Sequence, residues 1–157
     1  MSVRSAGILL WRDRGSEREV WIAHMGGPFW ARKEDRAWSI PKGELDPDDD
    51  PLEAARREFA EEMGVPAPAL EYVELGEYRY SSGKTVTVFA ADGGSFDLAE
   101  IHSNLFEVEW PPRSGLRQSF PEVDRAEWNG IELARRRLVA GQVPMLDDLP
   151  APASAGA

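Results

Sequence analysis

The sequence predicts an α/β fold, an α/β sandwich on a mixed β-sheet, from three observations. Strand-like runs rich in β-branched and aromatic residues occur both before and after one well-marked central helix, and a second helical pattern lies near the C-terminus. The length of 157 residues is enough for one apolar core. We therefore expect a single domain over residues 1–148 and a flexible tail over residues 149–157, which are rich in Pro, Ala, Ser and Gly.

The predicted strands are short runs separated by turn residues. They cover residues 3–12, 19–24, 37–40, 71–80, 84–91, 106–110 and 124–128. The turn sequence 81–83 predicts a hairpin, and the turn sequence 13–16 predicts a hairpin or two adjacent strands. The Pro- and Gly-containing segment 111–123 is expected to be a loop, and residues 131–140 a second helix.

The central helix is marked at both ends. Asp50 is a typical N-cap, Pro51 suits the first helical position, and Glu53 is placed to complete a capping box. Gly64 is expected at the left-handed C-terminal stop. Between these ends, one apolar stripe is formed by Leu52, Ala55, Phe59 and Met63.

Composition and charge exclude several classes of function. With 18 Lys and Arg against 28 Asp and Glu, the formal charge is −10, which disfavours binding to duplex nucleic acid. The chain has no Cys, so disulfides, Cys-ligated zinc and a thiol nucleophile are excluded. The apolar run 6–11 is too short to span a membrane, and no targeting segment is recognised, so we expect a cytoplasmic protein without a membrane partner.

Three glutamates crowd the polar side of the central helix: Glu58, Glu61 and Glu62. At about 100° per residue, Glu58 and Glu62 lie only about 40° apart. Like charges at this spacing destabilise a helix by roughly 0.2–0.5 kcal/mol per pair, and the helix dipole disfavours negative charge in the last turns. A hard divalent cation would remove both penalties, because carboxylate oxygens suit Mg²⁺ or Mn²⁺. A solvated acidic face is the alternative.

The acidic segment before the helix raises the possibility of an EF-hand calcium loop that starts at Asp46. Such a loop requires Gly at its sixth position and Glu at its twelfth. Pro51 and Arg57 occupy these positions, so the EF-hand interpretation is excluded.

The stretch from Gly43 to Val65 reads GELDPDDDPLEAARREFAEEMGV and resembles the Nudix box. The family pattern is Gly, five residues, Glu, seven residues, Arg-Glu, an aliphatic or aromatic residue, any residue, Glu-Glu, any residue, Gly and an apolar residue. The matching positions are Gly43, Arg57, Glu58, Phe59, Glu61, Glu62, Gly64 and Val65. Asp49 replaces the first family Glu with a shorter carboxylate. The resemblance implies a Nudix-type α/β/α sandwich on a mixed β-sheet.

The same resemblance implies a hydrolase that cleaves a phosphoanhydride bond in a nucleoside diphosphate derivative, with Mg²⁺ or Mn²⁺ as cofactor. The implied metal ligands are the carboxylates of Glu58, Glu61 and Glu62 and the main-chain carbonyl of Gly43. Together with Arg57, these three glutamates are the expected catalytic residues.

The roles of several charged residues follow from the same resemblance. Arg57 is expected to orient the box carboxylates and to pair with Asp49. The general base is left open among five glutamates, two in the box and three outside it: Glu58, Glu61, Glu107, Glu109 and Glu122. For the three outside the box, ordinary surface charge is the alternative.

Two residues suggest a substrate class. Lys42 stands in a Pro-Lys-Gly sequence similar to that of diadenosine polyphosphate hydrolases of the family, and Tyr80 lies about where those hydrolases tend to carry a Tyr. We therefore expect both to bind a nucleotide or polyphosphate, such as diadenosine tetraphosphate, although packing is the alternative for Tyr80. Hydrolysis of modified nucleoside triphosphates and a noncatalytic nucleotide-binding module stay open, as do a monomer and a homodimer.

Other aromatic and basic residues are expected to have structural or solvated roles. Packing is the expectation for Trp30, Trp38 and Trp128, with base stacking as the alternative. Arg113 and Arg117 lie in the predicted loop, where solvation is the default and a contact to a distal phosphate is the alternative.

Overall fold

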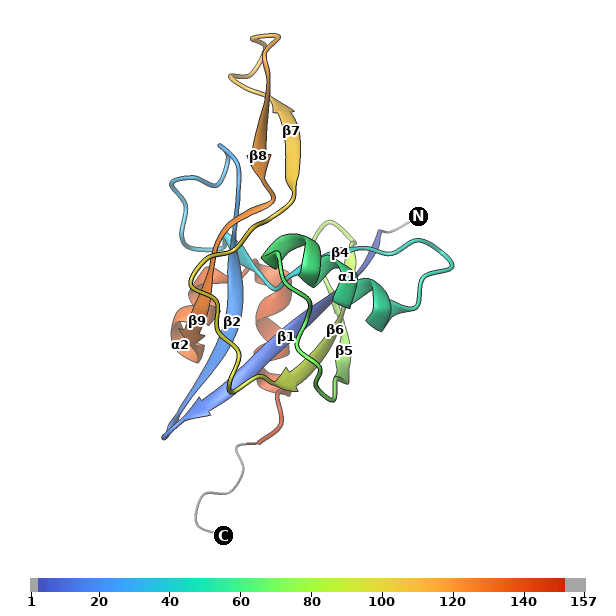
Figure 1. The fold of residues 1–157 in the computed structure, drawn as a ribbon, viewed down its shortest axis with the longest axis vertical. Coiled ribbons are helices and arrows are strands. Elements are labelled where there is room, and N and C mark those ends of the chain that lie inside the picture. Colours follow the sequence, from blue (N-terminus) through green and yellow to red (C-terminus); the bar gives the residue numbers. More distant parts are fainter. Residues whose placement is uncertain (1–2, 152–157) are drawn as a thin grey trace.

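The computed structural model describes residues 3–151 and shows a mixed β-sheet with helices on both sides (Figure 1). The helical elements are α1 (Pro51–Met63), α2 (Ile131–Arg137) and the 3₁₀ segment η1 (Ala140–Asp148). The strands are β1 (Arg4–Arg14), β2 (Glu17–Met25), β3 (Trp38–Ser39), β4 (Lys42–Glu44), β5 (Val73–Arg79), β6 (Thr85–Asp92), β7 (Leu105–Glu109), β8 (Arg117–Pro121) and β9 (Val123–Gly130). The predicted α/β sandwich is confirmed.

Strand β1 is central to the seven-stranded main sheet, whose order is β3-β2-β1-β6-β5, with β4 paired to β1 and β9 paired to β2. β1 and β6 run parallel, whereas the other pairs of this sheet are antiparallel. A parallel pair requires a long crossover, and the chain between β1 and β6 includes α1. This connection places α1 on the sheet beside β1 and β4.

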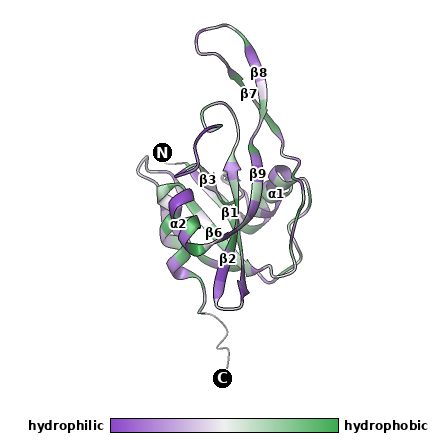
Figure 2. Cartoon of the chain, turned by 90° about the vertical axis from the view of Figure 1, so that its left-hand side faces the viewer, coloured by the Kyte–Doolittle hydropathy of each residue, from purple (hydrophilic) through white to green (hydrophobic). Residues whose placement is uncertain are grey.

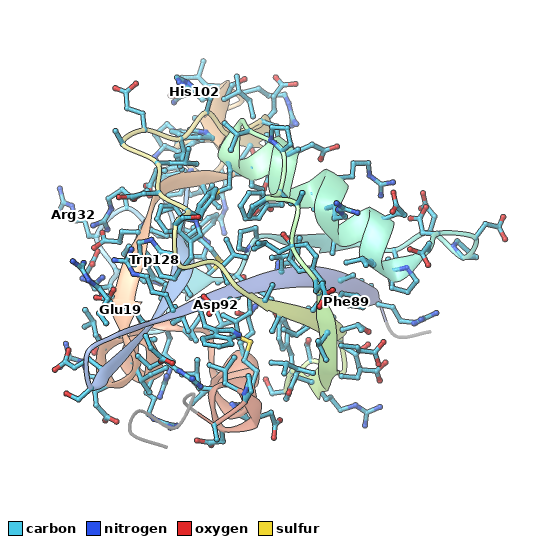
Figure 3. All side chains as sticks on the ribbon, turned by 60° about the horizontal axis from the view of Figure 1, so that its bottom comes forward. Glu19, Arg32, Phe89, Asp92, His102 and Trp128 are labelled. Carbon is cyan, nitrogen blue, oxygen red and sulfur yellow. The ribbon has the colours of Figure 1, made fainter. Side chains whose placement is uncertain are left out.

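Each face of the sheet has its own apolar core. On β1, Ile8 and Leu10 belong to the core under α1, whereas Leu9 belongs to the core under α2 and η1. Burial on both faces explains why β1 reads as a continuous apolar run. Figure 2 shows this hydrophobic centre, and Figure 3 labels Phe89 and Trp128, which contribute to the layer under α1.

The ends of α1 agree with the prediction. The Asp50 side chain accepts a hydrogen bond from the Glu53 backbone N–H at 3.0 Å, and Gly64 has φ 82°. The Glu53 side chain does not complete the expected capping box. Its carboxylate instead forms an ion pair with Arg56 at 3.8 Å. The helix is therefore capped at Asp50 by one hydrogen bond rather than by a reciprocal pair.

Two strands were not expected from the sequence. β4 is too short to show any alternation, and it forms because residues 42–44 pair with β1. β8 lies inside the segment expected to be a loop, and pairs with β7 in a separate two-stranded sheet. Its polar sequence gives no strand signal because this hairpin extends away from the core (Figure 1).

The second helix is shorter than expected. It ends at Arg137, and Leu138 adopts an extended conformation that forms a β-bridge with Trp38. The Val139 N–H donates to the Trp38 carbonyl at 2.9 Å. Pairing with a distant strand therefore ends α2, and η1 begins only at Ala140.

The C-terminal boundary predicted at residue 148 stays a prediction. Leu149 packs against the core, and the Pro150 carbonyl accepts a hydrogen bond from Arg18. The rest of the predicted tail, residues 152–157, lies outside the described residues. Among residues 3–151, no helix has the length and apolar character needed to cross a membrane.

Candidate active site

The loop and helix of the box meet along β1. β4 pairs with β1 so that Gly43 lies opposite Ala6 and Lys42 lies opposite Gly7. A Cβ atom on Gly7 would lie 2.7 Å from the Pro41 carbonyl oxygen, so the close approach of these segments requires a residue without a side chain. The pairing fixes the Gly43 peptide beside the helix that carries the glutamates.

Glu58 lies directly against Gly43. A Cβ atom at position 43 would be 2.0 Å from the Glu58 Cδ, far inside van der Waals contact. The absence of a side chain at Gly43 therefore lets the Glu58 carboxyl group rest on β4. This contact joins two of the residues implied as metal ligands.

Burial penalises the negative charge of two box glutamates. It raises the pKa of Glu62 to about 8, while the Lys42 ammonium opposes this rise and the carboxylates of Glu58 and Glu122 add to it. Burial also raises the pKa of Glu58 to about 7, and the neighbouring Glu61 carboxylate adds to that rise. The positive charges of Lys42 and Arg57 therefore do not offset the effects of burial and of the neighbouring carboxylates on these two pKa values.

A cavity of about 460 Å³, called here the carboxylate cavity, opens beside these groups. Its lining residues are Val3, Ser5, Lys42, Gly43, Glu44, Glu58, Glu62, Tyr80, Ser82, Lys84, Asn104 and Glu122. It brings together five predicted site residues: Lys42, Gly43, Glu58, Glu62 and Tyr80. Arg57 and Glu61, which were also predicted, are exposed and do not line it.

Arg57 has the partner expected from the sequence. Its Nη2 lies 3.5 Å from the Asp49 Oδ2, and that oxygen also accepts a hydrogen bond from the Asp46 N–H at 2.8 Å. The Arg57 charge opposes the rise in the pKa of Glu58. Asp49 therefore stabilises the loop before the helix and also lies within reach of Arg57.

Glu122 is the outside glutamate that reaches the cavity. Its backbone is held on both sides, because its N–H donates to the Asn104 carbonyl at 2.9 Å and its carbonyl accepts from the Gly26 N–H at 2.8 Å. Glu107 and Glu109 lie on the projecting β7 and do not line the cavity. The Glu109 carboxylate instead accepts from the Gly115 N–H at 2.8 Å within the hairpin.

Tyr78 and Tyr80 both contact η1. The Tyr78 hydroxyl donates to the Asp148 carboxylate at 2.6 Å, and the Tyr80 hydroxyl accepts from the Gln142 Nε2 at 2.8 Å. A Cβ atom on Gly141 would lie 2.2 Å from the Tyr80 ring. Tyr80 therefore packs tightly on η1 while it also lines the carboxylate cavity.

The tryptophans occupy different environments. Trp38 is fully buried, and its ring lies 5.4 Å from the His24 ring. Trp128 packs edge-on against Trp21 at 5.6 Å, as the packing expectation requires. Trp30 also contacts the core but lines a second, smaller cavity that adjoins the carboxylate cavity.

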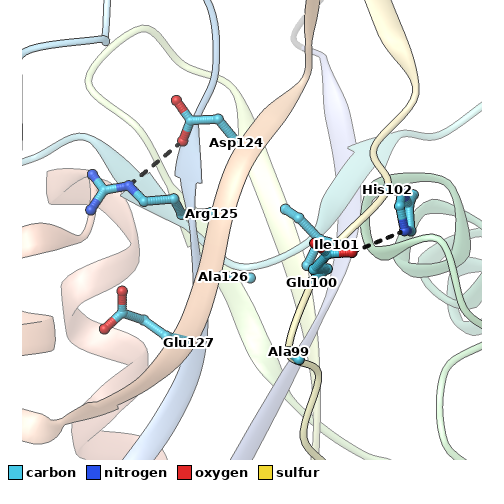
Figure 4. A pocket seen from close by; sticks show the side chains of 8 residues that line it. All are labelled: Ala99, Glu100, Ile101, His102, Asp124, Arg125, Ala126 and Glu127. Atoms are coloured by element: carbon cyan, nitrogen blue, oxygen red, sulfur yellow. Dashed lines mark ion pairs between the residues drawn. The ribbon is translucent and has the colours of Figure 1, made fainter.

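Another cavity, of about 410 Å³, lies between β9 and residues 99–102, and it contains none of the box residues (Figure 4). Its charged groups are already in contact with each other, with Arg125 beside Asp124 at 3.9 Å and His102 beside Glu100 at 4.0 Å. Because these groups are exposed and the cavity contains no box residue, the carboxylate cavity is the stronger candidate active site.

Comparison with known proteins decides the family. A family model described as the NUDIX domain matches residues 1–149. The chain belongs to the Nudix family of hydrolases. An RNA pyrophosphohydrolase of Bartonella henselae is 34% identical over 145 residues, which cover 82% of this chain and 76% of that protein.

Two further comparisons place this Nudix chain among its relatives. The Bacillus subtilis protein YtkD, whose name proposes 8-oxo-dGTP diphosphatase activity, is 31% identical over 98 residues, which make up 61% of each chain. This chain therefore spans less than two thirds of that relative. An Ap4A hydrolase of C. elegans superposes with a TM-score of 0.64 at 21% identity, covering 93% of both chains. At this identity the likeness shows the Nudix fold alone.

The chemistry of the Nudix box residues fits a divalent cation. Glu58 and Glu62 are partly buried carboxyl groups, and burial raises the pKa of both. The Glu58 carboxyl group also lies against the Gly43 backbone. Mg²⁺ and Mn²⁺ prefer such oxygen donors. Within residues 3–151, no three acidic or His side chains already stand as a ligand group, so the set of Glu58, Glu61, Glu62 and Gly43 stays a prediction.

Sequence reasoning missed five polar residues that line the carboxylate cavity of this Nudix chain: Ser5, Glu44, Ser82, Lys84 and Asn104. Lys84 and Asn104 line the carboxylate cavity, although they come from outside the box. Lys84 is the residue before β6, whose parallel pairing with β1 brings this end of the hairpin to the cavity. The Asn104 N–H donates to the Glu61 carbonyl at 2.9 Å, which ties its segment to the end of α1. Neither has a local sequence signal.

The raised pKa values predict how the stability of the metal-free Nudix chain changes with pH. The pKa values of Glu58 and Glu62, about 7 and about 8, exceed the value of 4.5 for an exposed Glu. Between pH 4.5 and about pH 8, the folded chain binds more protons than the unfolded chain. The free energy of unfolding should therefore fall as the pH rises through this range. Thermal unfolding in EDTA from pH 5 to pH 9 measures this.

The variant Glu62→Gln is the control for this pH dependence. It removes the titrating group with the larger shift, so its melting temperature should fall less steeply across the same pH range. An equally steep fall in the variant would show that Glu62 does not contribute as expected.

Proposed function

We propose that this chain is a metal-dependent pyrophosphohydrolase that cleaves a phosphoanhydride bond in a nucleoside diphosphate derivative. The observation that carries the proposal is the carboxylate cavity, where Glu58, Glu62 and Glu122 face the same space as Lys42 and Lys84. Carboxylates that hold a cation and lysines that contact phosphate are complementary to a polyphosphate. This arrangement also explains how a chain of charge −10 can bind an anionic substrate.

The residues divide the chemistry among them. Glu58, Glu61, Glu62 and the Gly43 carbonyl would hold Mg²⁺ or Mn²⁺. When bound, the cation neutralises phosphate charge and lowers the pKa of a water molecule that attacks phosphorus. Lys42 and Lys84 would bind and orient the phosphate chain, and Arg57 would orient Glu58.

We assign the role of general base to Glu122. Its carboxylate lines the cavity beside Glu62, and its backbone is fixed by hydrogen bonds to Gly26 and Asn104. A base must lie within reach of the proton that it removes, and the hairpin glutamates Glu107 and Glu109 do not line the cavity. Glu122 is therefore best placed to accept the proton of the attacking water.

A dinucleoside polyphosphate such as diadenosine tetraphosphate is the first candidate substrate. Lys42 and Tyr80, which prompted this expectation, both line the carboxylate cavity, and the fold resembles that of a protein named Ap4A hydrolase. The relatives named as RNA pyrophosphohydrolase and 8-oxo-dGTP diphosphatase favour two further candidates: the 5′ end of an RNA and a modified nucleoside triphosphate. The negative charge of this chain disfavours a long RNA.

The test is a substrate panel with product identification. Diadenosine tetraphosphate, a 5′-triphosphorylated RNA oligonucleotide, 8-oxo-dGTP and ADP-ribose are each incubated with Mg²⁺, with Mn²⁺ and with EDTA. We expect cation-dependent release of a mononucleotide from diadenosine tetraphosphate. Nucleotide binding without turnover on any substrate would instead identify a noncatalytic module. The cytoplasmic location and the choice between monomer and homodimer stay predictions.

A further inference from the structure

A second cavity of about 230 Å³, called here the aromatic cleft, adjoins the carboxylate cavity. Its lining residues are Met25, Gly26, Trp30, Ser39, Ile40, Lys42, Glu62, Phe106, Glu122 and Val123. Lys42, Glu62 and Glu122 line both cavities. A ligand that places a phosphate beside these three residues can therefore extend directly into the aromatic cleft.

One aromatic wall of the cleft is Trp30, in the loop after β2. The Trp30 N–H donates to the Gly27 carbonyl at 3.2 Å, and the Trp30 carbonyl accepts from the Lys33 N–H at 2.9 Å. The Lys33 ammonium lies over the Trp30 ring, 5.4 Å from its centroid, and the ring also packs against the core under α2 and η1. The loop is anchored where Met25 N–H donates to the Ala37 carbonyl at 3.0 Å.

A second aromatic residue that lines the cleft is Phe106, which comes from β7 of the projecting hairpin. Gly27 has φ 95°, and a Cβ atom there would lie 2.7 Å from the Phe106 ring, so the ring rests against the backbone of the Trp30 loop. The centroid of the Phe120 ring lies 6.3 Å from that of Phe106 and supports it from β8. These contacts fix the position of the hairpin beside the cleft.

We propose that the aromatic cleft binds a nucleobase of the substrate, with Trp30 and Phe106 as its walls. The proposal rests on the proposed function, which places the phosphates in the carboxylate cavity. A volume of about 230 Å³ is below the roughly 300–1,000 Å³ of pockets that enclose a drug-sized ligand, so the cleft suits one ring system rather than a whole dinucleotide. The shared residue Lys42 lies where the two parts of such a ligand meet.

The walls predict broad tolerance toward the identity of the base. Stacking on an aromatic ring is available to every base, because each base has a π-face. Of the polar residues that line the cleft, Ser39 already donates its hydroxyl hydrogen to the Ile40 carbonyl at 2.7 Å and accepts from Gln142 at 2.9 Å. The others, Lys42, Glu62 and Glu122, also line the carboxylate cavity, where the phosphates are proposed to bind. The cleft therefore selects for a planar base more than for one particular base.

The variants Trp30→Leu and Phe106→Leu test the proposal, because they keep an apolar side chain but remove the aromatic ring. On the best nucleotide substrate of the panel, each should raise KM about 10- to 100-fold and change kcat much less. Trp30→Phe should restore most of the affinity. Melting temperatures confirm that each variant is folded.

The matched control is Phe29→Leu. Phe29 lies in the same loop and contacts Trp110 at a ring distance of 5.4 Å, but it is 61% exposed and does not line the cleft. Its KM should stay at the wild-type value. A second readout is competition by inorganic tripolyphosphate, which has no base, so its inhibition constant should be the same for wild type, Trp30→Leu and Phe106→Leu.

The outcomes separate this inference from the proposed function. If the wild type hydrolyses nucleotides but both Leu variants keep a normal KM, the base does not bind in the cleft although the enzyme assignment stands. If the inhibition constant for tripolyphosphate rises as much as KM, the substitutions act on the phosphate end and the base-binding role is overturned. If the wild type neither binds nor hydrolyses any nucleotide, both proposals are wrong.

Discussion

Replacing Glu62 with Gln should lower kcat on the best substrate by about 10²- to 10⁴-fold. The pKa of Glu62 is raised more than that of Glu58, and Glu62 lines both the carboxylate cavity and the aromatic cleft. A Gln side chain has nearly the same shape but one anionic oxygen fewer for Mg²⁺ or Mn²⁺. Loss of several kcal/mol of charge stabilisation in the transition state corresponds to this range of rates. Steady-state kinetics at saturating cation concentrations measure the effect.

A measurement of stability shows whether the loss of kcat in Glu62→Gln comes from misfolding. Because the substitution removes a buried charge, the metal-free variant should be at least as stable as the wild type at pH 8. Glu53→Gln is the matched control, since Glu53 lies on the same helix but is exposed and does not line the cavity. Full turnover by Glu62→Gln would show that the assigned metal-binding role is wrong.

The second large effect is expected for Glu122→Gln, which should reduce kcat by about 10²- to 10⁴-fold with a small change in KM. This is the typical contribution of a positioned general base. Kinetics from pH 5 to pH 9 with a constant cation concentration measure both changes.

The hairpin supplies the matched control for Glu122. Glu107 was an equal candidate by sequence, yet it is exposed on β7 and does not line the carboxylate cavity. Glu107→Gln should therefore keep wild-type kcat and the same pH profile. A loss of activity in Glu107→Gln together with normal turnover in Glu122→Gln would reverse the assignment and require the hairpin to reach the substrate.

The two predictions report on different properties of the site. Loss of a cation ligand should weaken the response to Mg²⁺ concentration, so Glu62→Gln is expected to need more cation for half-maximal activity. Loss of the base should leave that concentration nearly unchanged in Glu122→Gln. A titration of activity against Mg²⁺ therefore distinguishes the two roles even if both variants are strongly impaired.

The central helix could be predicted because its signals are local. Asp50, Pro51 and Gly64 act through hydrogen bonds and backbone angles within one turn, so their effects do not depend on distant chain segments. The spacing of the box glutamates is likewise a property of any α-helix. The end of α2 could not be predicted, because Leu138 leaves the helix to pair with Trp38, about 100 residues earlier in the chain.

Sequence alone thus determined the helix, its row of carboxylates and the family of the chain. Tertiary structure decided which glutamate outside the box reaches the site, because Glu122 is held by Gly26 and Asn104 while Glu107 projects on the hairpin. It also brought Trp30 and Phe106 to one cleft. The physical reason is the separation along the sequence over which each effect acts. Capping and helical periodicity depend on a few neighbouring residues, whereas burial and cavity lining depend on which distant strands pair.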